Sequence, residues 1–204
     1  MEKMKKMKTI YCFVGRSNAG KDTLARMMAE EFNIPVICSY TDRPMRITEK
    51  QDVQHHFLSQ KAMNRLLSTE EILAYTLIAD KFGNGYRYCT TLKQFEEIAG
   101  EGMIYIIDPN GLDELKKHTD EFNLVVIHVL AQEMVRRMRS ISRGDLNFDK
   151  RNDDENAQFS KFESDLKNAD VVVLNDGNVV SAYDLMKQNL LGQHYINAVE
   201  EAKE

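Results

Sequence analysis

The feature that most constrains the fold of this chain is a glycine-rich segment that joins an apolar run to a helical pattern. The run Lys8–Val14 is rich in β-forming residues, and the apolar residues of Asp22–Phe32 recur at helical spacing. The segment between them reads Gly15, Arg16, Ser17, Asn18, Ala19, Gly20, Lys21, Asp22 and Thr23. Glycines let successive backbone N–H groups point at one anion, and the start of a helix adds a partial positive charge. The sequence therefore predicts a strand, a phosphate-binding loop and a helix, in the order of a P-loop.

Lys21 and Thr23 give this loop the residues of a nucleoside triphosphate site. The Lys21 ammonium would contact the β- and γ-phosphates of ATP, and the Thr23 hydroxyl would help to position Mg²⁺. The strict motif has Ser or Thr directly after the lysine, where this chain has Asp22. The alternative is a glycine-rich turn that binds nothing. We expect ATP as co-substrate, Mg²⁺ as cofactor, and ATP contacts from Gly15, Ser17, Asn18, Ala19, Gly20, Lys21, Asp22 and Thr23.

Strands and helices are expected to alternate along most of the chain. This order indicates an α/β fold, a P-loop three-layer sandwich with a mainly parallel sheet. Two runs within residues 73–89 are separated by Gly83, Asn84 and Gly85, which predicts an antiparallel hairpin. Beyond the first strand, the expected strands are 35–38, 73–78, 86–89, 103–107, 124–130 and 170–174, and the expected helices include 62–67, 134–141 and 179–191.

No linker rich in Pro, Ser or Gly divides the sequence, so we expect one domain with inserted subregions. A polar stretch runs from Gly144 through Asn156, and residues 193–204 are expected to form a surface helix or a frayed tail.

Charge and cysteine content exclude several classes of protein. The net charge of −5 provides no overall basic field for nucleic acid or anionic lipid, and no apolar run is long enough to span a membrane. The three cysteines lack the spacing of a zinc site or a disulfide framework. The adjacent His55 and His56 would point to opposite faces of an extended segment, which disfavours a shared metal site. We expect a cytoplasmic protein whose partners are nucleotides, with no nucleic acid or membrane partner; the oligomeric state stays open.

A second basic cluster follows the predicted strand 35–38. Arg43 and Arg46 lie three residues apart, close to the hydroxyls of Ser39 and Thr41. Guanidinium groups bind phosphate bidentately, so this group of side chains suits a second phosphate. A solvated loop with two surface arginines is an equally good interpretation of this segment alone.

From this cluster onward the sequence resembles the guanylate kinase family. That family has Ser-x-Thr-Thr-Arg-x-x-Arg-x-Gly-Glu here, followed by Gly-x-Asp-Tyr-x-Phe. This chain has Ser39, Thr41, Arg43, Arg46 and Glu49, followed by Asp52, His55 and Phe57. Three later segments are also similar to family motifs, namely Tyr86–Thr90, Ile106–Gly111 and Asp170–Asp176. The resemblance therefore covers most of the chain, in order.

The resemblance implies a domain layout, with a core of residues 8–39 and 91–192, an acceptor-binding insert at about 40–90 and a mobile lid at about 140–156.

The resemblance also implies roles for individual residues. The acceptor monophosphate would be held by Ser39, Arg43, Arg46, Tyr88 and His55, with His55 in the place of the family's phosphate-binding tyrosine. Thr90 and Asp108 would face the base. Arginines of the lid region would stabilise the transferring phosphoryl group. By the resemblance these are Arg139, nearer the donor adenine, Arg143 and Arg151, so that Lys21, Arg143 and Arg151 are the predicted catalytic residues. Arg136 and Arg137 are interpreted as a salt-bridged helix surface.

Two departures from the family concern the base and the metal. The family's base-reading glutamate would lie near Ala74, where this chain has no carboxylate; Glu70, Glu71 and Asp80 are the available substitutes. A pocket that lacks one buried polar partner loses discrimination between substrates. Ile106 replaces the first acid of the family's aspartate pair.

Together these observations predict an ATP-dependent phosphotransferase, a nucleoside-monophosphate kinase of guanylate-kinase type that acts on GMP, dGMP or a related nucleotide. One alternative is a P-loop kinase for another phosphorylated small molecule, such as ribose 1,5-bisphosphate. The missing glutamate favours that alternative, whereas Thr90 and Asp108 count against it. The other is a catalytically inactive guanylate-kinase-like binding domain, against which the presence of Lys21, Arg143 and Arg151 counts.

Overall fold

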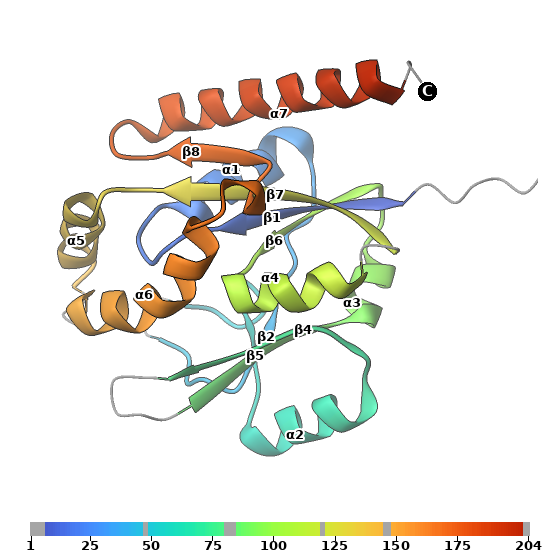
Figure 1. The fold of residues 1–204 in the computed structure, drawn as a ribbon. Helices are drawn as coiled ribbons and strands as arrows, with labels where there is room; N and C mark the ends of the chain where they lie inside the picture. Colours follow the sequence, from blue (N-terminus) through green and yellow to red (C-terminus); the bar gives the residue numbers. More distant parts are fainter. Residues whose placement is uncertain (1–6, 47–48, 80–84, 119–120, 145–147, 202–204) are drawn as a thin grey trace, which may run out of the picture. The chain divides into compact units, whose positions relative to one another are not determined.

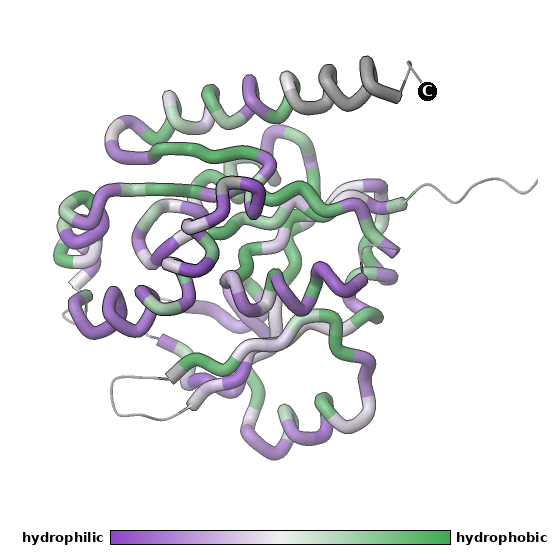
Figure 2. Tube along the Cα trace, in the orientation of Figure 1, coloured by the Kyte–Doolittle hydropathy of each residue, from purple (hydrophilic) through white to green (hydrophobic). Residues whose placement is uncertain are grey.

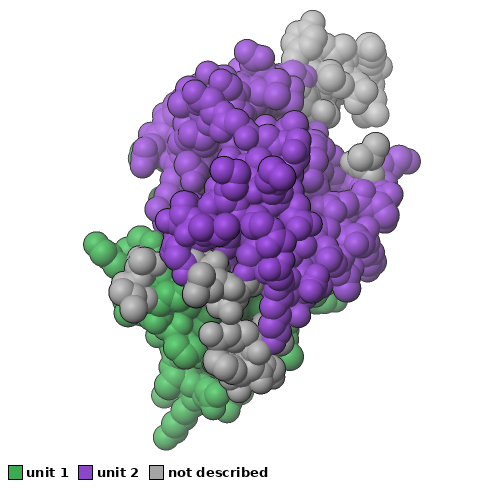
Figure 3. Space-filling model, turned by 90° about the vertical axis from the view of Figure 1, so that its left-hand side faces the viewer, with its two compact units in different colours: residues 1–12, 33–124 green, residues 13–32, 125–204 purple. Residues whose placement is uncertain are grey.

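A computed structural model describes residues 7–46, 49–79, 85–118, 121–144 and 148–201. The chain divides into two compact units, coloured separately in Figure 3. Unit 1 comprises Met1–Cys12 and Asn33–Leu124, and unit 2 comprises Phe13–Phe32 and Val125–Glu204. The predicted insert, 40–90, falls within the range of unit 1, and the predicted lid, 140–156, within that of unit 2. The boundaries of insert and lid stay predictions, and their residues 47–48, 80–84 and 145–147 lie outside the described residues.

One four-stranded sheet has the order β6-β1-β7-β8 (Figure 1). Its strands are β6 (Gly102–Ile106), β1 (Lys8–Val14), β7 (Phe122–Leu130) and β8 (Val171–Leu174). Strands β7 and β8 pair in parallel, with Ile127 opposite Val171. β1, β7 and β8 are largely hydrophobic along their length (Figure 2), as expected of strands buried in a parallel sheet. The α/β class and the mainly parallel sheet are therefore confirmed.

The predicted strand 35–38 was wrong in extent. Only Val36 forms a bridge, parallel to Ile104, supported by backbone hydrogen bonds on either side of it. Two of the four residues of this run, Pro35 and Val36, are exposed. A run of four residues that begins with proline lacks one ladder donor, and here it ends after a single bridge.

Unit 2 contains four long helices, α1 (Lys21–Phe32), α5 (Glu133–Ser142), α6 (Phe148–Glu163) and α7 (Val179–Glu201). A short 3₁₀ helix, Leu166–Asn168, follows α6. Helix α7 packs against β8 and α1, and it continues past the predicted end at Leu191 to Glu201.

Helix α6 is the main difference from the sequence-based expectations, which had a polar stretch through Asn156 and no helix here. The helix begins at Phe148 and buries a narrow stripe of Phe148, Asn152, Phe159 and Phe162. Nearly all its other residues are hydrophilic (Figure 2). Three phenylalanines spread over sixteen residues gave too weak a periodic pattern to indicate a helix.

Unit 1 contains a second four-stranded sheet with the order β3-β2-β5-β4. Its strands are β3 (His56–Phe57), β2 (Tyr40–Thr41), β5 (Gly85–Thr91) and β4 (Ile72–Ala79). Strands β4 and β5 are antiparallel, which confirms the predicted hairpin, although Gly83 and Asn84 lie outside the described residues. The helices of this unit are α2 (Gln60–Thr69), α3 (Leu92–Glu97), α4 (Pro109–Leu115) and the 3₁₀ turn Lys116–His118.

Local signals explain where these helices begin. The Ser59 side chain accepts a hydrogen bond from the Ala62 amide at the start of α2. Thr91 and Gln94 form a capping box on α3, and the Asp108 carboxylate caps α4. Each cap satisfies backbone N–H groups that lack a partner in the first turn.

The register of the β4–β5 pair determines which side chains share a face. Ala74 pairs with Thr90 and Thr76 with Tyr88. Because side chains alternate along a strand, these four side chains lie on one face of the hairpin. This face carries the predicted acceptor-binding residues Tyr88 and Thr90.

Candidate functional site

The phosphate loop between β1 and α1 needs both of its glycines. Gly20 has φ +96°, and a Cβ atom there would collide with the Asn175 side chain. A Cβ atom on Gly15 would collide with the carbonyl oxygen of Val129. Asn18, at φ 63°, is a second left-handed residue in the loop. The loop therefore curls tightly against β7 and the segment that follows β8.

Arg139 and Asn175 hold the carbonyl side of this loop. Arg139 Nη1 donates to the carbonyl oxygens of Asn18, at 3.2 Å, and Ala19, at 3.1 Å. Asn175 Nδ2 also donates to the Ala19 carbonyl oxygen, at 2.8 Å, and Arg139 Nη2 donates to the Asn175 carbonyl oxygen, at 2.8 Å. Because these hydrogen bonds hold the carbonyl groups of Asn18 and Ala19, the side chains of Arg139 and Asn175 stabilise the conformation of the loop. A contact between Arg139 and the adenine stays a prediction.

Helix α6 is tied to the first half of the loop by Arg16. The Nε and Nη2 atoms of Arg16 donate to Glu163 at 3.0 and 2.9 Å, and Nη1 donates to Asn156 Oδ1 at 2.6 Å. The same guanidinium lies over the Phe159 ring, 5.3 Å from its centroid. The Ser17 amide donates to Glu155 Oε2 at 3.0 Å, and the Ser17 hydroxyl donates to the same carboxylate.

Arg16, Glu155 and Glu163 were not among the predicted site residues. The signal that could have revealed them is the spacing of 155, 159 and 163, which places three side chains on one face of a helix. It was not recognised because the segment was not expected to be helical.

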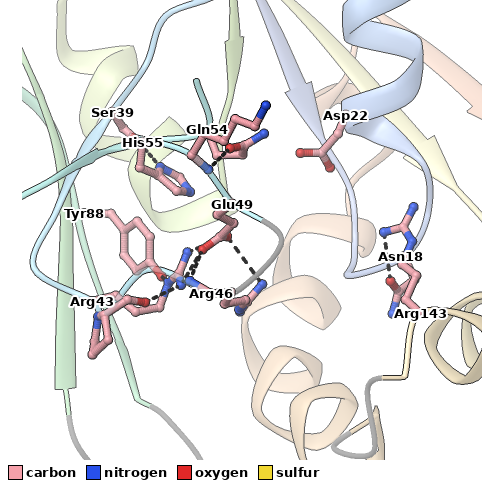
Figure 4. Close-up of polar contacts among 12 residues, drawn as sticks. Asn18, Asp22, Ser39, Arg43, Arg46, Glu49, Gln54, His55, Tyr88 and Arg143 are labelled. Atoms are coloured by element: carbon pink, nitrogen blue, oxygen red, sulfur yellow. Dashed lines mark hydrogen bonds and ion pairs between the residues drawn. The ribbon is translucent and has the colours of Figure 1, made fainter. Parts of the chain in front are cut away.

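The remaining predicted donor-site residues lie around the same loop. Lys21 Nζ is 3.9 Å from Asp22 Oδ2, and Thr23 is exposed in the first turn of α1. Arg143, at the end of α5, donates from Nη1 to Asn18 Oδ1 at 3.4 Å (Figure 4). Arg151 is half-buried on α6. The structure thus brings Arg143 to the loop directly.

Of the two arginines interpreted as surface residues, one is buried. Arg137 forms the expected ion pairs with Glu133 and Asp149. Arg136 is only 4% exposed; its Nε donates to the Ala131 carbonyl oxygen and its Nη2 to Asn152 Oδ1 at 2.8 Å. On α5 the first arginine is buried and the second is partly exposed. The sequence of two adjacent arginines does not show which of them is buried.

A second cationic cluster lies in unit 1, around Glu49. Arg43 donates to both carboxylate oxygens of Glu49, at 2.9 and 2.8 Å, and its Nε donates to the Tyr88 hydroxyl at 2.8 Å (Figure 4). Arg46 Nη1 is 3.8 Å from Glu49. The Arg43 side chain is 11% exposed and that of Arg46 is 56% exposed. Burial acts to raise the pKa of Glu49, but hydrogen bonds from Arg43 and the Arg46 amide hold it below its usual range.

Ser39 and His55 complete this cluster. Ser39 Oγ and His55 Nδ1 are 2.9 Å apart and share a hydrogen bond. The His55 ring makes edge contacts with the rings of Phe57 and Tyr88, with centroids 5.7 and 5.4 Å away. Five predicted acceptor residues, Ser39, Arg43, Arg46, His55 and Tyr88, are therefore gathered around Glu49 (Figure 4).

The residues predicted to face the base lie near one another on the hairpin face and at the start of α4. Thr90 Oγ1 donates to the Tyr105 hydroxyl at 3.3 Å. Asp108 Oδ1 accepts from the amides of Asn110 and Gly111 at 3.0 and 3.2 Å. Burial raises the pKa of Asp108, although the two amides and the neighbouring Thr76 hydroxyl favour its ionised form.

On this face of the β4–β5 hairpin, position 74 carries no acidic side chain. Ala74 is buried, with 1% of its surface exposed. Glu70 ends α2 and Glu71 is exposed beside it, while Asp80 lies outside the described residues. Of the described residues on this face of the hairpin and at the start of α4, Asp108 is the carboxylate that a base could meet.

Within the part of the chain that the structure describes, no group of three or more His, Cys, Asp and Glu side chains could hold a metal ion. No described helix combines the length and apolar character needed to cross a membrane.

Comparison with known proteins gives consistent matches. The family model described as guanylate kinase matches residues 6–191. A guanylate kinase of Brucella melitensis is 30% identical over 129 residues, which are 60% of this chain and 56% of that protein. A guanylate kinase of Chlamydia caviae is 26% identical over 188 residues, 90% of this chain and 87% of that protein.

The fold is shared with a solved structure as well. The crystal structure of guanylate kinase from Anaplasma phagocytophilum matches with a TM-score of 0.65 at 22% identity, covering 93% of this chain and 88% of that one. The matched region spans just over half the length, 56%, of several curated relatives, those of Brucella melitensis, Brucella abortus and Agrobacterium fabrum among them.

Proposed function

This chain belongs to the guanylate kinase family, and we propose that it is an ATP-dependent kinase that phosphorylates a nucleoside monophosphate, GMP or dGMP in the first place. The observation that carries the proposal is the presence in one chain of two separate arrangements whose chemistry suits phosphate. One is the loop Gly15–Thr23 in unit 2, and the other is the cluster around Glu49 in unit 1. A kinase with a phosphorylated acceptor needs both.

The donor arrangement suits a triphosphate. Backbone N–H groups of the loop and the start of α1 provide partial positive charge, and Lys21 provides a full one. Arg143 is held at the loop by Asn18, and Arg151 lies on α6, which Arg16 ties to the same loop. In phosphoryl transfer the protein contributes mainly positioning and charge stabilisation. Lys21, Arg143 and Arg151 are the residues we assign to that task.

The acceptor arrangement suits a monophosphate. Glu49 orients Arg43 from one side and Tyr88 from another, which fixes the guanidinium before any ligand arrives. Arg46 is more exposed and can close on a phosphate. The acceptor's phosphate oxygen is already anionic, so the transfer needs no general base. Thr90 and Asp108 would meet the base of the acceptor.

Mg²⁺ is the expected cofactor, and the donor loop offers residues that fit it. Asp22 and Thr23 provide hard oxygen ligands beside Lys21, and Mg²⁺ is bound by one or two carboxylates together with substrate phosphates. The ion, when bound, would neutralise charge on the β- and γ-phosphates. The reaction places the protein where ATP and nucleotides are available, and a cytoplasmic location is part of the proposal.

A coupled assay of ADP release tests the proposal. Wild-type protein with Mg·ATP is screened against GMP, dGMP, AMP, CMP, UMP, dTMP and ribose 1,5-bisphosphate, with Lys21→Ala as the control. We expect turnover with GMP or dGMP that depends on Lys21. Turnover with ribose 1,5-bisphosphate alone would move the substrate to the alternative kinase. No turnover with any acceptor, despite ATP binding, would overturn the kinase proposal in favour of a binding domain.

A further inference from the structure

The residue after the loop lysine is a carboxylate. Asp22 stands in the first turn of α1, at the position where a strict P-loop has the hydroxyl that binds Mg²⁺. Its side chain is 64% exposed, and its carboxylate is 3.9 Å from Lys21 Nζ, beyond hydrogen-bond distance. Figure 4 shows Asp22 at the start of the helix that follows the loop carrying Asn18. The Asp22 oxygens are therefore open to a ligand.

An acid at this position conflicts with the binding of bare phosphate. Negative charge at a helix N-terminus is favourable by itself, because of the helix dipole. The same N-terminus is where the loop would bind the phosphates of the donor nucleotide, and two anions a few ångströms apart repel each other. A divalent cation between carboxylate and phosphate converts that repulsion into attraction.

We propose that Asp22 is a direct protein ligand of the Mg²⁺ ion that accompanies the donor nucleotide, taking the place of the P-loop hydroxyl. This inference rests on the proposed function, since it needs a nucleotide on the loop. Thr23, the next residue and also exposed, supplies a hydroxyl to the same first turn. The chemical class of the ligand is a hard divalent cation, with oxygen donors from Asp22 and from the nucleotide.

The composition of the site predicts an order of assembly. Among the described residues, no three acidic, histidine or cysteine side chains meet to hold a metal by themselves. One carboxylate binds Mg²⁺ weakly in water, so phosphate oxygens must complete the coordination. The cation is therefore expected to bind with the nucleotide and hardly at all without it.

The carboxylate also predicts how the nucleotide behaves without metal. Asp22 then repels the phosphates, so its removal should improve metal-free binding while it weakens metal-dependent binding. A residue that serves only as a partner of Lys21 or of the helix dipole would change both conditions in the same direction. The two conditions together therefore separate a metal ligand from a structural acid.

The test measures ADP affinity by calorimetry, in excess Mg²⁺ and in EDTA, for wild type, Asp22→Asn and Asp22→Ser. Binding of Mn²⁺ is followed in parallel by electron paramagnetic resonance, with and without ADP. Glu30→Gln is the matched control, because Glu30 is an exposed acid on the same helix, about 12 Å farther along its axis. Circular dichroism establishes that each variant is folded.

We expect Asp22→Asn to weaken Mn²⁺ binding in the presence of ADP by at least about 10-fold, because loss even of a residue that only orients a metal ligand costs about 10–100-fold. Binding of ADP in EDTA should stay equal or become tighter. Asp22→Ser should retain part of the metal effect through its hydroxyl, and Glu30→Gln should match wild type. A full metal effect in Asp22→Asn would overturn this inference alone. Wild-type protein that binds no ADP in Mg²⁺ would instead overturn the proposed function, and this inference with it.

Discussion

The two arrangements proposed to bind phosphate in this chain are built from different chemical groups. In unit 2 the loop Gly15–Thr23 relies on backbone conformation, since Gly20 and Asn18 have positive φ. Arg139 donates to the carbonyl oxygens of Asn18 and Ala19, and Asn175 also donates to that of Ala19. In unit 1 the cluster relies on side chains, with Arg43 fixed by Glu49 and Tyr88. An added Cβ atom should therefore disrupt the conformation of the loop, whereas the cluster should depend on the guanidinium group of Arg43. This difference predicts which substitutions affect which ligand.

The largest effect is expected at Gly20. In Gly20→Ala the left-handed φ is strained and the new Cβ collides with Asn175, so the loop cannot direct its amides at phosphate. Each charge-assisted hydrogen bond that is lost costs about 1.5–3 kcal/mol, and loss of two weakens ATP binding by at least about 100-fold. Calorimetric titration with ATP measures this.

Gly100 provides the matched control for Gly20. It has nearly the same dihedral, φ +97°, but a Cβ there would meet nothing within 4 Å. Gly100→Ala should cost about 1 kcal/mol of folding stability from the strained φ and leave ATP affinity unchanged. Equal loss of ATP affinity in both variants would mean that backbone strain anywhere, rather than the loop, controls binding.

The next largest effect is expected at Arg43. Lysine keeps the charge but cannot make the two parallel bonds to Glu49 and the third to Tyr88. Arg43→Lys should raise the KM for the acceptor by about 10–100-fold and leave ATP affinity unchanged. Arg46→Lys, at an exposed position, should raise it by a smaller factor. Steady-state kinetics with varied acceptor checks both, and an equal effect of the two would contradict a preorganised Arg43.

A smaller effect is expected where α6 meets the loop. Arg16 donates two hydrogen bonds to the Glu163 carboxylate, and the two side chains are 15% and 29% exposed. A double-mutant cycle with Arg16→Ala and Glu163→Gln should give a coupling free energy of about 1 kcal/mol in urea unfolding. The cycle Arg16→Ala with Glu30→Gln, an exposed acid on α1, serves as control. Additive effects in the first cycle would show that the contact does not hold α6.

The smallest effect concerns acid stability in unit 1. The pKa of Glu49 is held below its usual range by Arg43, so its ionised form stabilises the folded state. This contribution is complete above the pKa of the unfolded chain, about 4.3, and is lost as pH falls through the lower pKa of the folded state. Wild type and Glu49→Gln should differ in free energy of unfolding at pH 7 and converge in acid. A difference that persists unchanged at pH 2 would contradict this assignment.

Some parts of this molecule were readable from the sequence because they have a strong local pattern. Lys8–Val14 and the loop after it combine a buried strand, glycines and a lysine in fixed order, and the structure has a strand and a helix at these residues. The hairpin β4–β5 likewise followed from two β-rich runs with a glycine turn between them. The predicted roles of individual site residues are not tested by these observations.

Other parts depend on contacts between distant residues, which no local pattern contains. Arg16 finds its partners Asn156 and Glu163 more than a hundred positions away, and α6 itself has too few apolar residues to be recognised. Arg136 and Arg137 are neighbours in sequence, but the first is buried and the second pairs with Asp149 at the surface. Tertiary packing, and not the local sequence, determines which of these side chains are buried and which partners they contact.

The most direct test of the account measures the binding of ATP and of GMP separately, by calorimetry, to wild type, Lys21→Ala and Arg43→Ala. If the loop binds the donor phosphates and the cluster around Glu49 binds the acceptor phosphate, the two variants should lose different ligands. We expect Lys21→Ala to lose ATP binding and keep GMP binding, and Arg43→Ala to lose GMP binding and keep ATP binding. Loss of the same ligand in both variants, or of neither, would contradict it.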